Sequence, residues 1–100
     1  MYSTQLSFLN LLQKQRCHSC FFTIVPYTIE FYEDIIILSD HSTGQRVDLH
    51  YDKIHPILED YKQMDTNQFI LAYGKDPFSL NNFKDDILLE FKTRIEYEPR

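Results

Sequence analysis

The sequence predicts an α+β fold: an antiparallel sheet or partly open barrel of about 5–6 strands, with an N-terminal helix and a long C-terminal helix. Two observations carry this prediction. Residues 20–51 are rich in β-branched and aromatic residues between short turn signals, whereas apolar residues recur at helical spacing at both ends of the chain. The chain has 100 residues, 43% of them hydrophobic, which suffices for one core. We therefore treat residues 1–100 as a single domain, with a helix over 1–16 and a body over 20–98.

The first segment, STQLSFLNLLQKQ, predicts a helix over residues 3–15. Leu6, Leu9 and Leu12 recur at helical spacing, with Phe8 as an alternative to Leu9, and Lys14 suits the C-terminal end. We interpret this segment as a helix docked on the domain, because amphipathic faces usually face a core. The alternative is an arm that packs on a partner.

The next segment predicts successive strands. Pro26 divides one strand from the next or bends one long strand, and Glu33-Asp34 forms a turn. Residues 35–38, IIIL, predict a strand that is covered on both faces, and residues 41–44 predict a second turn. A further strand over 46–51 alternates in character, with Val47, Leu49 and Tyr51 on one side and Arg46, Asp48 and His50 on the other.

The C-terminal half is predicted to hold two helices and one strand. Residues 52–65 favour a short helix, with a bent strand as the alternative, and residues 67–73 predict a strand that Gly74 ends. Residues 81–98 fit both periods but are too long for a typical strand, so we predict a helix. Its apolar stripe would be Phe83, Ile87, Phe91 and Ile95, with Glu90 and Arg94 as a supporting ion pair.

Both cysteines lie in the short stretch Arg16-Cys17-His18-Ser19-Cys20. With His50 and His55 they could supply four zinc ligands, but 29 residues separate Cys20 from His50, far more than in a small zinc finger. A redox pair normally lies at a helix N-terminus, whereas this pair follows a predicted helix. We therefore expect ordinary thiols, with Cys20 entering the core, and keep zinc as an alternative.

A second candidate site is Glu90-Phe91-Lys92 together with Asp76. An acid-x-lysine sequence with an earlier aspartate resembles the signature of the metal-dependent PD-(D/E)xK nucleases, which implies acids that hold Mg²⁺ and a lysine that helps to activate water. The sequence reads Asp76-Pro77 rather than Pro-Asp, and only eight residues follow Lys92. We expect these charges to form the solvated face of the last helix, with a nuclease or nuclease remnant as the alternative function.

The distribution of charge limits the classes of partner. Residues 1–26 carry a net charge of +2, and residues 27–100 carry −7, which gives −5 for the chain. Because phosphate contacts dominate nucleic-acid binding, so acidic a body disfavours nucleic acid and anionic membranes as partners. The first 26 residues are the better candidate for contact with an anionic group.

The order of elements from YTIEFYEDIIILSDHSTGQRVDLHYDKI through NQFILAYG to NFKDDILLEFKTRIEYE resembles the pleckstrin-homology-like superfold, which includes PH, GRAM, phosphotyrosine-binding and FERM third-lobe modules. The resemblance covers residues 20–98 and implies a non-enzymatic platform for lipid headgroups, peptides or proteins. In the lipid-binding members the early turns are rich in Lys and Arg. The corresponding turns here, residues 33–34 and 41–44, lack both residue types, which favours a peptide or protein partner.

We therefore predict a non-enzymatic interaction module in the cytoplasm, without a cofactor, that binds a protein or peptide; a homodimer is left open. No apolar run reaches the length of a membrane span, and the start does not read as a signal peptide. The candidate binding residues are Lys14, Arg16, Arg46, Lys53 and Tyr73.

Overall fold

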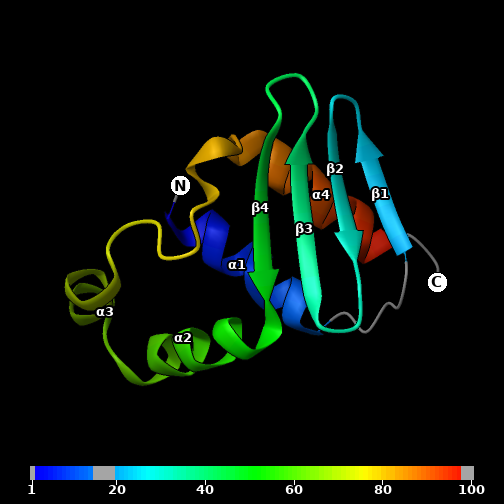
Figure 1. The fold of residues 1–100 in the computed structure, drawn as a ribbon. Coiled ribbons are helices and arrows are strands. Elements are labelled where there is room, and N and C mark those ends of the chain that lie inside the picture. The colour runs from blue at the N-terminus through cyan, green and yellow to red at the C-terminus, as the bar shows by residue number, and fades with distance from the viewer. Residues whose placement is uncertain (1, 15–19, 98–100) are drawn as a thin grey trace.

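The computed structural model describes residues 2–14 and 20–97 of the chain (Figure 1). The elements are α1 (Tyr2–Lys14), β1 (Cys20–Ile24), β2 (Tyr27–Phe31), β3 (Ile35–Asp40), β4 (Gln45–His50), α2 (Tyr51–Gln63), α3 (Thr66–Tyr73), the short 3₁₀ helix η1 (Leu80–Asn82) and α4 (Asp85–Tyr97). The predicted α+β class is confirmed. The predicted number of strands is wrong, since the described residues form four strands rather than 5–6.

The four strands form an antiparallel meander in the order β1-β2-β3-β4. Two-residue turns at 25–26 and 33–34 and a four-residue turn at 41–44 join them, as the turn residues predicted. Gly44 has a φ of 77°, a backbone conformation that glycine adopts without steric cost. Because every connection is short, each strand pairs with its neighbour in the chain.

Helices α1 and α4 cover one face of the sheet, behind the strands in Figure 1. The side chains that the strands point toward these helices form the core with them, because alternate residues of a strand share a face. The buried strand residues are Ile29, Phe31, Ile36, Leu38, Val47 and Leu49, and the buried helix residues are Leu6, Phe8, Leu9, Leu12, Leu88, Phe91 and Ile95. The helix predicted over 3–15 is therefore docked on the sheet.

The second face of the sheet is not covered by any described element (Figure 1). The prediction that residues 35–38 are covered on both faces is wrong. Ile36 and Leu38 are fully buried, whereas Ile35 and Ile37 point to the other face and are half-buried. The described elements form two layers, so alternate residues of even an apolar strand remain partly in water.

The helix predicted over 52–65 is confirmed as α2, which begins at Tyr51. The strand predicted over 67–73 is wrong, because this segment is α3. The Asp65 side chain accepts from the Gln68 backbone N–H, and the Gln68 side chain accepts from the Asp65 N–H, which is a capping box that starts a helix. Phe69 then packs against Tyr61 of α2 and against Tyr73, with ring centroids 5.1 Å and 4.8 Å apart.

The predicted C-terminal helix is confirmed as α4, but it begins only at Asp85. The predicted ion pair between Glu90 and Arg94 is absent from the described contacts. Arg94 instead donates a hydrogen bond from Nη1 to the carbonyl oxygen of Thr23 in β1, at 2.7 Å. The neighbouring strand edge offers a fixed acceptor, whereas an exposed ion pair on a helix contributes only about 0.3–0.5 kcal/mol.

Cys20 differs from its predicted state. It is disulfide-bonded rather than a thiol, and it is half-buried against the core. The only other cysteine of the sequence, Cys17, lies outside the described residues. None of the described helices is long and apolar enough to cross a membrane.

Candidate functional site

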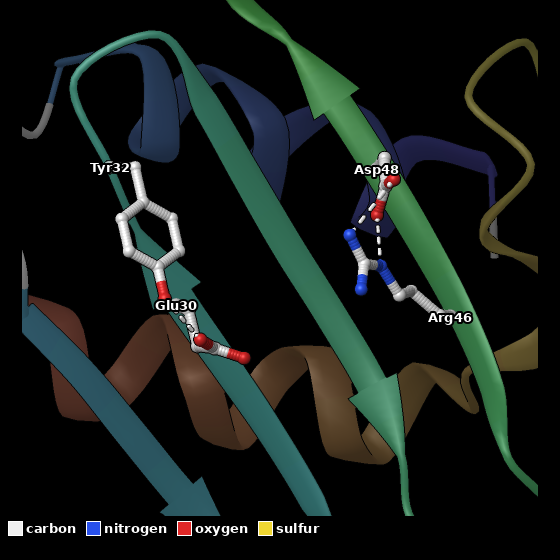
Figure 2. A network of polar contacts seen from close by, with 4 residues as sticks. All are labelled: Glu30, Tyr32, Arg46 and Asp48. Carbon is white, nitrogen blue, oxygen red and sulfur yellow. Dashed lines mark hydrogen bonds and ion pairs between the residues drawn. The ribbon is translucent and has the colours of Figure 1, made fainter.

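The uncovered side of the sheet, which we call the open face, is the candidate functional site. The strand register aligns Phe21, Glu30, Ile37 and Asp48 in one row across all four strands, and Thr23, Thr28, Ser39 and Arg46 in the next row. Tyr32, just after β2, shares this face with Glu30 (Figure 2). The meander thus places apolar, hydroxyl and charged side chains together on one surface.

The apolar part of the open face is unusual for a sheet that faces water. Phe21 is 68% exposed and Tyr32 is 39% exposed, while Ile35 and Ile37 are half-buried. An antiparallel sheet with one solvated face normally places polar residues on that side. Here each of the first three strands, or the turn that follows it, adds a large apolar or aromatic side chain.

Two polar pairs lie among these side chains (Figure 2). The Tyr32 hydroxyl donates to Glu30 Oε1 at 2.5 Å. Arg46 donates to both carboxylate oxygens of Asp48, from Nε at 2.6 Å and from Nη2 at 3.3 Å. Each pair joins residues two apart in the chain, because alternate residues of a strand point to the same side.

These contacts change the ionisation of the partners. The hydrogen bond to Glu30 raises the pKa of Tyr32, since the ionised phenol could no longer donate it. The hydrogen bond from Arg46 lowers the pKa of Asp48, and the same bond raises the pKa of Arg46. At neutral pH Asp48 is therefore a carboxylate, Arg46 a guanidinium and Tyr32 a neutral phenol.

The five predicted binding residues do not come together. Arg46 lies on the open face, and Lys53 is exposed on α2 beside a small cavity at the edge of β4. Lys14 lines a hollow between α1 and α2, and the Tyr73 hydroxyl donates to the Asp60 carboxylate, which raises the pKa of Tyr73. Arg16 lies outside the described residues.

The residues of the nuclease signature do not form one site. Asp76 accepts from the backbone N–H groups of Leu80 and Asn81, at 2.8 Å and 2.6 Å, and so caps η1. Glu90 and Lys92 lie on α4, two positions apart in the sequence. Residues with this separation on a helix point in directions about 200° apart around its axis. The strand on which both would face one metal is not formed.

The predicted zinc ligands are likewise divided. His50 is the N-cap residue of α2, and His55 hydrogen-bonds through Nδ1 to the Gln13 side-chain amide of α1. Cys20 is engaged in its disulfide bond, and Cys17 lies outside the described residues. Within residues 2–14 and 20–97, no group of three or more His, Cys, Asp or Glu side chains could hold a metal ion.

Sequence reasoning missed the apolar residues of the open face. Ile37 lies in the run IIIL, which was predicted to be covered on both faces, and Phe21 was assigned to neither face. The alternation of residues along the strands could have identified them. Val47 and Leu49 define the inward-facing positions of β4, and the short turns fix which positions of the other strands face the same side. Counting back from β4 places Ile37 and Phe21 outward.

No family model matches this chain, and no curated protein or solved structure matches it either. The resemblance to the pleckstrin-homology-like superfold therefore stays a prediction, and the function is argued from the surface alone.

Proposed function

We propose that this chain is a non-enzymatic interaction module that binds a partner protein through the open face of its sheet. The observation that carries the proposal is the set of large apolar side chains on a face that no described element covers, with Phe21 68% exposed at its edge. Apolar patches of this kind, rimmed by polar residues, typically mark protein-interaction surfaces. Aromatic side chains are also the residues most often enriched at the centre of such surfaces.

The charges around the patch favour a partner with basic groups. Glu30 and Asp48 are acidic, Glu33 and Asp34 follow in the adjacent turn, and Arg46 is already bound to Asp48. Complementary charges at the rim of an interface speed association and suppress wrong partners more than they add affinity. We therefore propose a partner surface with an apolar centre and a Lys- or Arg-bearing rim.

The location of the paired groups supports the same proposal. The Arg46–Asp48 pair holds the long Arg46 side chain in one orientation before binding, which lowers the conformational entropy that is lost when an interface forms. The Tyr32 ring, held by Glu30, is similarly fixed. Both pairs pre-order polar side chains beside the apolar row.

The experiment that tests the proposal is site-specific photo-crosslinking. A photoreactive phenylalanine analogue replaces Phe21 in one protein and Leu71 in a matched control, since Leu71 is 88% exposed on α3, away from the open face. Each protein is irradiated in a lysate of the source cells, and the adducts are identified by mass spectrometry. A protein adduct from position 21 but not from position 71 supports the proposal. The same adducts from both positions, or none from position 21, would contradict it.

A further inference from the structure

The two outer edges of the sheet differ in how their backbone groups are used. At β1, Cys20, Phe22 and Ile24 exchange hydrogen bonds with β2. The N–H and C=O groups of Phe21 and Thr23, which alternate with them, therefore point outward. Arg94 of α4 donates to the Thr23 carbonyl at 2.7 Å. A strand added at this edge would first have to displace the Arg94 side chain, so this contact protects the β1 edge from strand addition.

The β4 edge lies on the opposite side of the sheet (Figure 1). The Tyr51 N–H donates to the Asp34 carbonyl at 3.2 Å, which makes Ile35 and His50 a pair without mutual hydrogen bonds. By alternation, Val47 and Leu49 bond to β3, and the N–H and C=O groups of Arg46 and Asp48 point outward. No described contact occupies these outward groups.

A small cavity lies against this unpaired edge. Its volume is about 150 Å³, and three consecutive β4 residues, 48–50, line one wall. The apolar lining residues are Leu49, Ile54, Ile57, Pro77 and Phe78. An apolar cavity of about this volume holds a group the size of benzene, which is close to the size of one leucine side chain.

We propose that the β4 edge binds an extended segment of a partner protein as an added strand, with one aliphatic side chain of that segment in the cavity. This inference rests on the proposed interaction function and names the element that the partner contributes. Strand addition combines backbone hydrogen bonds, which supply affinity, with pockets for alternate side chains, which supply specificity. Leu49, Ile54 and Phe78, which line the cavity, belong to the core on the helix side of the sheet. The cavity therefore takes a residue that faces the helix side, and the neighbours of that residue face the open side.

The charge at the cavity specifies the segment further. Lys53 lines the cavity, is exposed, and makes no ion pair with another described residue. Asp48, the carboxylate on the same rim, is already bound by Arg46. A carboxylate on the same side of the segment as the aliphatic anchor would therefore meet an unpaired cation. Because alternate residues of a strand share a side, we assign the segment an acidic residue two positions from its anchor.

A second copy of this chain does not fit the site. The apolar side chains of its β4, Val47 and Leu49, are buried in its own core and cannot enter the cavity. Two β4 edges that paired with each other would thus leave the cavity unfilled. The occupant is therefore a segment of a different protein.

The probe is a capped heptapeptide of threonine and valine, with a central leucine and a glutamate two residues before it. Amide hydrogen exchange of the parent protein is measured with and without this peptide. We expect slower exchange at Arg46 and Asp48 and unchanged exchange at Val47 and Leu49, since only the first two point outward. Slower exchange at Phe21 and Thr23 instead, or no change at saturating peptide, would overturn the proposal.

Two variants isolate the backbone contribution. Asp48→Pro and Asp48→Ala both remove the carboxylate, but only proline removes the outward N–H, and proline is tolerated where that group faces outward. We expect Asp48→Ala to bind the peptide, and we expect the affinity of Asp48→Pro for it to be lower by a factor of about ten or more. Equal affinity of the two variants would exclude strand addition. A peptide with threonine in place of leucine should lose a similar factor, and an equal affinity would exclude the cavity as its anchor site.

Two further measurements distinguish failure of the edge proposal from failure of the proposed interaction function. If crosslinking from position 21 succeeds in the parent protein, while the peptide does not bind to it, the interaction function stands and the edge proposal fails. If no adduct forms from position 21, the proposed function itself fails. A dimer of the parent protein in sedimentation that Asp48→Pro abolishes would assign the edge to a second copy and overturn the inference.

Discussion

Arg94 of α4 donates a 2.7 Å hydrogen bond to the backbone carbonyl of Thr23, 71 residues earlier in the chain. This hydrogen bond links the last helix to the first strand and occupies an outward acceptor of the β1 edge. Without it, the β1 edge would resemble the β4 edge, as a row of unpaired backbone groups.

The first prediction follows from this contact. Arg94→Ala should lower the free energy of unfolding by about 0.5–1.5 kcal/mol, the usual net value of one hydrogen bond. It should also increase self-association, because the freed edge can pair with other chains. Urea denaturation and sedimentation velocity measure the two effects. Glu96→Ala, an exposed position of the same helix, serves as the control, and self-association equal to that of the control would contradict the prediction.

The second prediction separates binding from stability at Phe21. Because its side chain is 68% exposed, Phe21→Ser should change the free energy of unfolding by no more than about 0.5 kcal/mol. The same substitution should abolish capture of the partner that crosslinks from this position. Thermal denaturation and affinity capture with Leu71→Ser as the control test both parts. If Phe21→Ser unfolds the protein, Phe21 belongs to the core rather than to a binding surface.

The third prediction concerns acid stability. Hydrogen bonds from the Ser42 hydroxyl and backbone N–H, at 2.6 Å and 3.0 Å, hold the pKa of Asp40 below its ordinary value. A carboxyl with a lowered folded-state pKa stabilises the fold above its unfolded pKa of about 3.9, and this contribution is lost as the pH falls through the folded value. Asp40→Asn should therefore be less stable than the parent at pH values near 7, and the difference should shrink below a pH of about 4.

Urea midpoints at a series of pH values measure this difference. Glu33→Gln, which neutralises an exposed carboxyl in the neighbouring turn, is the matched control. A stability difference between parent and Asp40→Asn that does not change with pH would contradict the assignment. NMR titration adds a direct check, since Ser42→Ala should raise the pKa of Asp40 toward its ordinary value.

The fourth prediction concerns two glycines with positive φ. Gly74 ends α3 with φ 83° and ψ −178°, a region that essentially only glycine adopts, so Gly74→Ala should cost about 1–3 kcal/mol. A Cβ at Gly74 or Gly44 would meet no atom within 4 Å, so any cost comes from the backbone alone. At Gly44, with φ 77°, asparagine should be tolerated better than alanine. Urea denaturation of the three variants tests this order, and equal stability of Gly44→Ala and Gly44→Asn would contradict it.

Local patterns predicted most elements because local physics forms them. The Leu6, Leu9 and Leu12 spacing predicted α1, and the turn at Glu33-Asp34 separated β2 from β3. The failure at residues 67–73 has an identifiable cause: Phe69, Ile70 and Leu71 read as a strand, and the capping box just before them was overlooked. The β propensity of these residues is outweighed by the capping box and by ring packing against α2.

The candidate site was less accessible to sequence reasoning. The sequence pattern placed Arg46 on the side of its strand opposite Val47 and Leu49. It predicted that residues 35–38 are covered on both faces, and it assigned Phe21 to neither face. Whether an apolar residue of a strand is buried depends on how many layers the domain has, and no single strand carries that information. The zinc and nuclease predictions failed for a similar reason, because sequence spacing does not show whether side chains point to one place. Glu90 and Lys92 point to different sides of α4, whereas Asp76 and His50 lie at the starts of two different helices.

The sequence by itself determined the class of fold, the helices at both ends, the turns of the meander and the acidic charge of the body, because periodicity, turn chemistry and composition act over a few neighbouring residues. Only the tertiary structure decided that helices cover one face of the sheet, that Arg94 guards one edge, and that a cavity lies beside the other. Those features depend on contacts between residues such as Thr23 and Arg94, which only the packing of α4 against β1 brings together.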